Sequence, residues 1–118
     1  MAIPSGSGTE VLKVGLLNQA SGTAENIILD GVALHIYTIL SVCMTNTNGS
    51  PSNINLFIKD DGGATDYYLL KSQAVDGLGT FVWSDKFVME GTDELVFQTD
   101  ATEAFSVVTS YIDQNWID

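Results

Sequence analysis

The chain has 118 residues, of which 45% are hydrophobic and only 16% are charged. A chain of this length can bury an apolar core within one domain without disulfides or metals. Fifteen acidic residues face four lysines and no arginine, so the formal net charge is −11. Because Lys and Arg neutralise phosphates at nucleic acids and anionic membranes, this composition argues against both partners.

Strand-like segments with alternating hydrophobicity follow one another along the whole chain, separated by turns rich in Gly, Asn and Asp. In chain order, the expected strands are 11–17, 26–30, 32–45, 54–59, 67–72, 80–83, 87–89, 94–99 and 104–112. Segments 80–83 and 87–89 are either two short strands or one bent strand. The pattern predicts an all-β protein, a single antiparallel β-sandwich or jelly-roll-like domain of about seven to nine short strands.

The two ends of the chain differ from this pattern. Residues 1–9, with Pro4 and a Ser-Gly-Ser-Gly run, predict a flexible N-terminal arm, and no secretory signal is expected there. Residues 114–118 form a short tail after the sandwich domain, which we expect over residues 10–113. Since apolar and aromatic residues in such segments favour packing on the domain or on a partner, four residues are expected to contribute to an interface: Ile3, Pro4, Trp116 and Ile117.

The longest apolar segment, 32–45, is rich in β-branched residues, which favours a strand over a helix. Simple alternation places one set of side chains on one face: Ile36, Leu40, Val42 and Met44. It places a second set on the other face: Tyr37, Ile39, Ser41, Cys43 and Thr45.

Catalytic chemistry finds little support in the residues. The single histidine, His35, shares the predicted face of Cys43, but eight residues of strand separate them by roughly 26 Å at about 3.3 Å per residue. A Cys–His pair within one straight strand is therefore excluded, and the lone Cys43 also rules out an internal disulfide. We expect a protein that is not an enzyme and has no cofactor.

Two binding chemistries are considered as alternative hypotheses. Asp60, Asp61 and Asp66 lie in a Gly-bearing loop, and Ca²⁺ prefers clustered carboxylates, but the spacing differs from an EF-hand and Asp-Gly is common in hairpins. Exposed aromatic side chains form a possible platform for sugars: Tyr67, Tyr68, Trp83, Tyr111 and Trp116. For Trp83, packing in the core is the favoured role.

Several segments together resemble a known family. They are Ser41-Val42-Cys43-Met44-Thr45-Asn46, Ile54-Asn55-Leu56-Phe57-Ile58, Tyr67-Tyr68-Leu69-Leu70, Gly79-Thr80-Phe81, Gly91-Thr92-Asp93-Glu94-Leu95 and Val107-Val108-Thr109-Ser110-Tyr111. From residue 28 to residue 113 the chain resembles small β-sandwich virion structural proteins of tailed bacteriophages. The resemblance implies a non-enzymatic domain used in many copies. It transfers no functional residue, because the matching motifs are strands and turns.

On this resemblance we expect a capsid decoration (cement) protein that binds the outer shell and stabilises contacts between capsid subunits. Its partners would be the major capsid protein or other virion proteins and further copies of itself, as a homotrimer or other homo-oligomer. It would be made in the host cytoplasm and reside on the virion, most often on the outer capsid surface. The alternatives are a neck, tail or fibre accessory protein and, from another class, a carbohydrate-binding module. In the virion role, the contact face should carry little of the net charge of −11.

Overall fold

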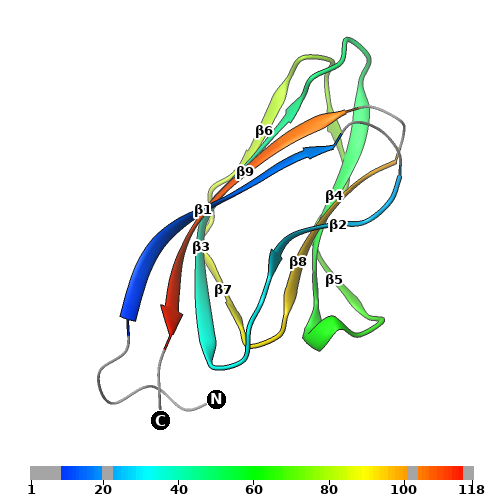
Figure 1. Ribbon diagram of the computed structural model, residues 1–118. Helices are drawn as coiled ribbons and strands as arrows, with labels where there is room; N and C mark the ends of the chain where they lie inside the picture. Colours follow the sequence, from blue (N-terminus) through cyan, green and yellow to red (C-terminus); the bar gives the residue numbers. More distant parts are fainter. Residues whose placement is uncertain (1–8, 20–22, 101–103, 116–118) are drawn as a thin grey trace.

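The computed structural model describes residues 9–19, 23–100 and 104–115 (Figure 1). Over these residues the chain forms nine strands: β1 (Thr9–Gln19), β2 (Asn26–Asp30), β3 (His35–Asn46), β4 (Ser52–Lys59), β5 (Asp66–Val75), β6 (Thr80–Trp83), β7 (Phe87–Glu90), β8 (Glu94–Thr99) and β9 (Phe105–Asn115). One 3-10 turn, η1 (Asp60–Gly62), follows β4. Among the described residues, no helix is long and apolar enough to cross a membrane.

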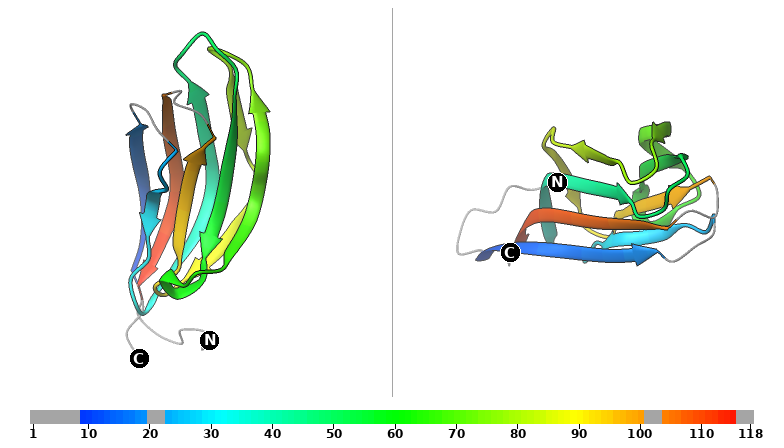
Figure 2. Two further views of the ribbon diagram at one scale, coloured as in Figure 1. Left: turned by 90° about the vertical axis from the view of Figure 1, so that its right-hand side faces the viewer. Right: turned by 90° about the horizontal axis from the view of Figure 1, so that it is seen from above.

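The strands form two antiparallel sheets that face each other (Figure 2). Sheet A has the order β1-β9-β3-β6, with β7 also pairing β3, and sheet B has the order β2-β8-β4-β5. The chain passes from one sheet to the other at most connections, which is the interleaved order of a jelly roll. The predicted all-β sandwich is confirmed, and β6 and β7 are two short strands that pair with successive parts of β3.

The core lies between the sheets and follows the alternation of most strands. The side chains that are almost fully buried there include Ile39, Val42, Met44, Ile54, Leu56, Met89, Leu95, Phe97, Phe105 and Val107. The rings of Phe97 on β8 and Phe105 on β9 lie 5.5 Å apart and join the two sheets. In β4 the core side chains are Ile54 and Leu56, in β8 they are Leu95 and Phe97, and in β9 they are Phe105 and Val107.

Strand β3 departs from the predicted alternation. Its register with β9 shifts between Ile39 and Ser41, so that one extra residue is accommodated as a bulge. Tyr37 and Ile39 before the bulge and Val42 and Met44 after it are all buried. The prediction that these two pairs lie on opposite faces was wrong. Strict alternation of inward and outward side chains does not indicate where an extra residue is inserted.

Two loops at one end of the sandwich are joined backbone to backbone. The amide of Leu78 donates to the Asn48 carbonyl at 2.8 Å, and the amide of Asn46 donates to the Gly79 carbonyl at 2.9 Å. Gly77 lies so close to the neighbouring loop that a Cβ there would be 2.2 Å from the carbonyl oxygen of Gly49. Only glycine fits at this position, so the β5–β6 and β3–β4 connections are fixed against each other.

Candidate functional site

The outer face of sheet A, which points away from the core, is apolar and exposed. The strand register aligns Leu16, Val108, Cys43 and Val82 in one row across β1, β9, β3 and β6. A second row contains Leu12, Ile112, Thr38 and Val88. We call this surface the apolar face and define it by Leu12, Val14, Leu16, Cys43, Val82, Val88, Val108 and Ile112. Exposed apolar surface that is contiguous across several strands marks interaction sites in soluble proteins.

The apolar face carries almost no charge. The positions between its two rows include Ser41, Ser110 and Val14. The row beyond Leu12 consists of Glu10, Gln114, Ile36 and Glu90. Among the described residues of the two rows that flank the apolar face, these two glutamates are the acidic side chains. A face of low charge is what we expected of a contact surface on a chain of net charge −11, and sheet A has such a face.

The outer face of sheet B is different, because two of its apolar side chains are fully buried. Phe57 and Val96 point outward by alternation but are fully buried. The Tyr68 ring lies 5.1 Å from the Phe57 ring, and Lys59 Nζ lies 5.9 Å from its centroid. Lys59 Nζ also pairs with Glu25 Oε1 at 3.0 Å and with Asp66 Oδ1 at 3.4 Å. Phe57 and Val96 are therefore covered on this face, whereas Ile27, which pairs with Val96 in the same row, is 48% exposed.

A charge cluster around the buried Asp113 lies on the inner side of sheet A. Asp113 on β9 accepts hydrogen bonds from Lys13 Nζ on β1 at 2.7 Å and from His35 Nδ1 on β3 at 2.6 Å. Burial by itself would raise the pKa of Asp113, but the hydrogen bonds from Lys13 and His35 outweigh burial and hold that pKa below 3.8. The same hydrogen bond raises the pKa of Lys13. The carboxylate thus ties three neighbouring strands together.

The cluster contains half of a catalytic arrangement. An aspartate that orients a histidine is the supporting pair of a nucleophilic triad. Within the described part of the chain, however, the His35 ring contacts the Asp113 carboxylate and the stacked Tyr37 ring at 5.8 Å, and neither is a nucleophile. Cys43 lies beyond the bulge on the outer face, so the predicted shared face of His35 and Cys43 was wrong. The sequence did not identify Asp113 or Lys13, because they lie 78 and 100 residues from their partners along the chain.

The three acidic residues of the calcium hypothesis do not converge. Asp60 and Asp61 belong to η1, while Asp66 begins β5 and pairs with Lys59. Asp61 Oδ1 accepts a hydrogen bond from the Thr92 hydroxyl, and the Asp61 amide donates to Asp93 Oδ1. Across residues 9–19, 23–100 and 104–115, no three acidic, histidine or cysteine side chains are grouped so that they could hold a metal ion.

Most of the aromatic side chains considered for sugar binding are already in contact with the protein. Trp83 packs on the core, as favoured, and its Nε1 donates to the Asp85 carbonyl at 2.8 Å. Tyr68 lies against Phe57, with Lys71 Nζ 4.5 Å from its ring centroid. Tyr111 meets the Tyr37 ring edge to face, and Tyr67 is exposed. The expected interface residues Ile3, Pro4, Trp116 and Ile117 lie outside the described residues.

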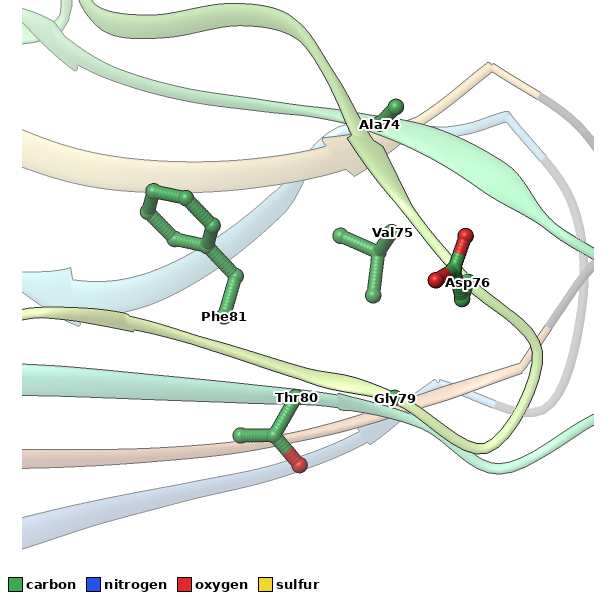
Figure 3. A pocket seen from close by; sticks show the side chains of 6 residues that line it. All are labelled: Ala74, Val75, Asp76, Gly79, Thr80 and Phe81. Carbon is green, nitrogen blue, oxygen red and sulfur yellow. The ribbon is translucent and has the colours of Figure 1, made fainter.

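A small pocket opens between β5 and β6, at the edge of the sandwich (Figure 3). Its volume is about 190 Å³, and it is lined by Ala74, Val75, Asp76, Gly79, Thr80 and Phe81. Ligand sites for small molecules usually measure about 300–1,000 Å³. The pocket is therefore too small for a sugar chain or a nucleotide.

Comparison with known proteins finds solved structures of a similar fold but no matching family and no matching curated sequence. No family model matches the chain, and no curated protein matches it. A structure of Bacillus endospore appendages, described as disulfide-linked pili, matches with a TM-score of 0.60 and 14% identity over 99% of this chain and 97% of that chain. A structure of the acid-stable capsid of Helicobacter pylori bacteriophage KHP30 matches with a TM-score of 0.58 and 9% identity, covering 91% and 93%. At these identities the similarity shows a shared fold, found in both a pilus protein and a phage capsid protein.

Proposed function

We propose that this chain is a non-enzymatic structural protein of a phage virion, and specifically a capsid decoration (cement) protein on the outer shell. The observation that carries the proposal is the apolar face of sheet A, which is exposed and almost free of charge on a strongly acidic chain. Its partners are the major capsid protein and further copies of itself, as a homotrimer or other homo-oligomer. The fold shared with a phage capsid protein supports this assignment.

Burial of the apolar face supplies the binding energy in this role. Leu12, Leu16 and Val82 are 71%, 76% and 53% exposed, so each has much of its side chain left to bury. Complete burial of such a side chain contributes about 1.5–3 kcal/mol, and part of this sum offsets the entropy lost on association. Orienting the neutral face toward the shell also directs the acidic groups to solvent, where repulsion between neighbouring copies is screened.

Undecorated capsids of the same phage provide the test. The wild-type protein should bind them saturably and raise the temperature at which they disrupt. Val82→Lys should weaken binding at least tenfold, because a lysine in the centre of a buried contact has no partner. Val32→Lys is the matched control, since Val32 is also 53% exposed but lies outside the apolar face. Equal binding by both variants and the wild type would exclude the apolar face as the contact surface.

Two further measurements address the terminal segments and the position on the particle. Deletion of residues 1–8 together with 116–118 should weaken binding if the arm and tail contribute contacts, and undiminished binding would remove them from the interface. Stoichiometry on intact particles should scale with the number of capsid subunits for a decoration protein. A few copies per particle would indicate a neck, tail or fibre component instead.

A further inference from the structure

Strand β1 forms an edge of sheet A (Figure 1) and is rich in apolar residues. It runs for 11 residues and, in the part of the chain that the structure describes, its only strand partner is β9. Edge strands of this length are normally protected by charges, bulges or proline, because their free backbone groups recruit another strand. In β1 the only charged residues are Glu10 and Lys13, and Lys13 is engaged with Asp113 on the inner side.

The sequence of β1 is complementary to itself in antiparallel orientation. Its bounds, Thr9–Gln19, are centred on Val14, so a two-fold axis at Val14 pairs all of its residues with those of a second copy. Leu12 then lies opposite Leu16, and Val14 opposite Val14, all on the apolar face. This register also keeps the outer faces of both copies on the same side, because side chains directly opposite each other point the same way.

Charge favours the same register. Lys13 lies opposite Gly15 and Glu10 opposite Asn18, so no two like charges face each other directly. A shift of two residues in one direction would bring Lys13 opposite Lys13, which is destabilising in a sheet. Gly15 itself lies close to β2, since a Cβ there would be 3.1 Å from the Ile28 carbonyl oxygen.

We infer that two copies of this chain associate through β1, in antiparallel register about Val14, so that their A sheets form one continuous sheet. Self-complementarity identifies the partner as a second copy rather than an unrelated strand. The joined sheet carries two apolar faces side by side on one surface. For its role in the virion this inference rests on the proposed function, but the pairing is a property of the free protein.

A cysteine at the two-fold axis tests the register. Directly opposed residues in antiparallel strands have Cα atoms about 4.5–5.5 Å apart, within the range of about 4.4–6.8 Å that a disulfide needs. In a Cys43→Ser background, Val14→Cys should form a covalent dimer under mild oxidation. Leu12→Cys in the same background is the matched control and should stay monomeric under denaturing conditions, because it faces Leu16. Equal cross-linking by both, or none by either, overturns the inference.

Charge substitution tests the pairing independently. Leu12→Glu and Leu16→Lys should each raise the dimer dissociation constant at least tenfold in sedimentation experiments. The double variant should recover most of the loss, because each introduced carboxylate faces an introduced ammonium group of the other copy. Additive losses in the double variant would overturn the inference. Val82→Lys, on the opposite edge of the sheet, should dimerise like the wild type.

The two proposals fail in different ways. A wild-type protein that dimerises through β1 but does not bind capsids supports the pairing and refutes the decoration role. A wild-type protein that is monomeric at the concentration at which it saturates capsids refutes the pairing and leaves the decoration role intact.

Discussion

Asp113 has an effect on stability that its place near the end of the chain does not suggest. Its carboxylate joins β1, β9 and β3 through Lys13 and His35, and its side chain is 7% exposed. Asp113→Asn keeps the shape but removes the charge from both hydrogen bonds, so we expect a loss of about 1–3 kcal/mol in the free energy of unfolding. Urea denaturation measures this loss. Asp85→Asn, at an exposed turn position, is the control and should change stability by no more than the experimental error.

The charge cluster also predicts how stability depends on pH. The pKa of Asp113 lies below its ordinary value of 3.8 in the folded protein, so the folded state releases this proton more readily than the unfolded state. The ionised carboxylate therefore stabilises the fold above pH 3.8, and this contribution is lost as the pH falls through the lower folded pKa. Urea midpoints across the acid range should fall less steeply for Asp113→Asn than for the wild type. Parallel curves would contradict the assignment.

Lys13 gives the corresponding effect at alkaline pH. Its pKa is raised above 10.5 by the hydrogen bond to Asp113, so its stabilising contribution is present below that pH and is lost as the pH rises through the folded pKa.

At the residue scale, the sequence analysis considered His35 as a candidate functional residue but neither of its cluster partners, Asp113 and Lys13. Contacts between residues this far apart in the chain follow only from the strand order and register.

Strand β3 shows how far alternation can predict an element. The β-branched content of segment 32–45 correctly indicated a strand, and the ends of β2, β6 and β8 agree with the predicted ranges. The start of β3 was predicted three residues too early, because Val32 to Leu34 form a turn in which Leu34 has a φ of 69°. The bulge at Leu40 then reversed the faces of the first half. The bulge is defined by the register with the partner strand β9, which the local sequence does not contain.

The loop contact at Gly77 carries a prediction about two connections. Gly77→Ala would place a methyl group 2.2 Å from the Gly49 carbonyl oxygen, and neither backbone can move far without breaking the Leu78–Asn48 and Asn46–Gly79 hydrogen bonds. We expect a loss of about 1–3 kcal/mol, as for other overpacked sites. Gly49→Ala, where nothing lies within 4 Å of the added Cβ, is the control on the partner loop. Thermal unfolding of the two variants should differ clearly, and equal midpoints would contradict the close contact.

For the whole molecule, the strand pattern predicted the fold class but not where an exposed apolar surface would lie. Leu16, Val108, Cys43 and Val82 come from four segments spread over most of the chain, and no segment alone indicates a patch. The strand order β1-β9-β3-β6 brings them into one row. In a jelly roll, strands from distant parts of the chain lie side by side. The residues that share a surface are therefore determined by the strand order rather than by their proximity in the sequence.

The net charge of −11 predicts the salt dependence of the inferred dimer. Two acidic copies repel each other, while the β1 contact itself contains apolar side chains and backbone groups. Because salt screens the repulsion and leaves the contact largely unchanged, the dissociation constant should fall as sodium chloride rises from about 20 mM to about 150 mM. Sedimentation equilibrium measures this change. Weaker association at higher salt would show that ion pairs hold the dimer and would contradict a neutral interface.

The two outer faces of the sandwich are unlike each other, and this limits how copies can accumulate. Sheet A leaves its apolar side chains exposed, whereas sheet B buries Val96 and covers Phe57 with Tyr68 and Lys59. A copy that rests on a surface through sheet A presents to newcomers the face of sheet B, where Phe57 and Val96 are covered and leave little apolar area for a second contact. Deposition would therefore stop after a single layer, and the thickness of the coat would be set by the subunit itself.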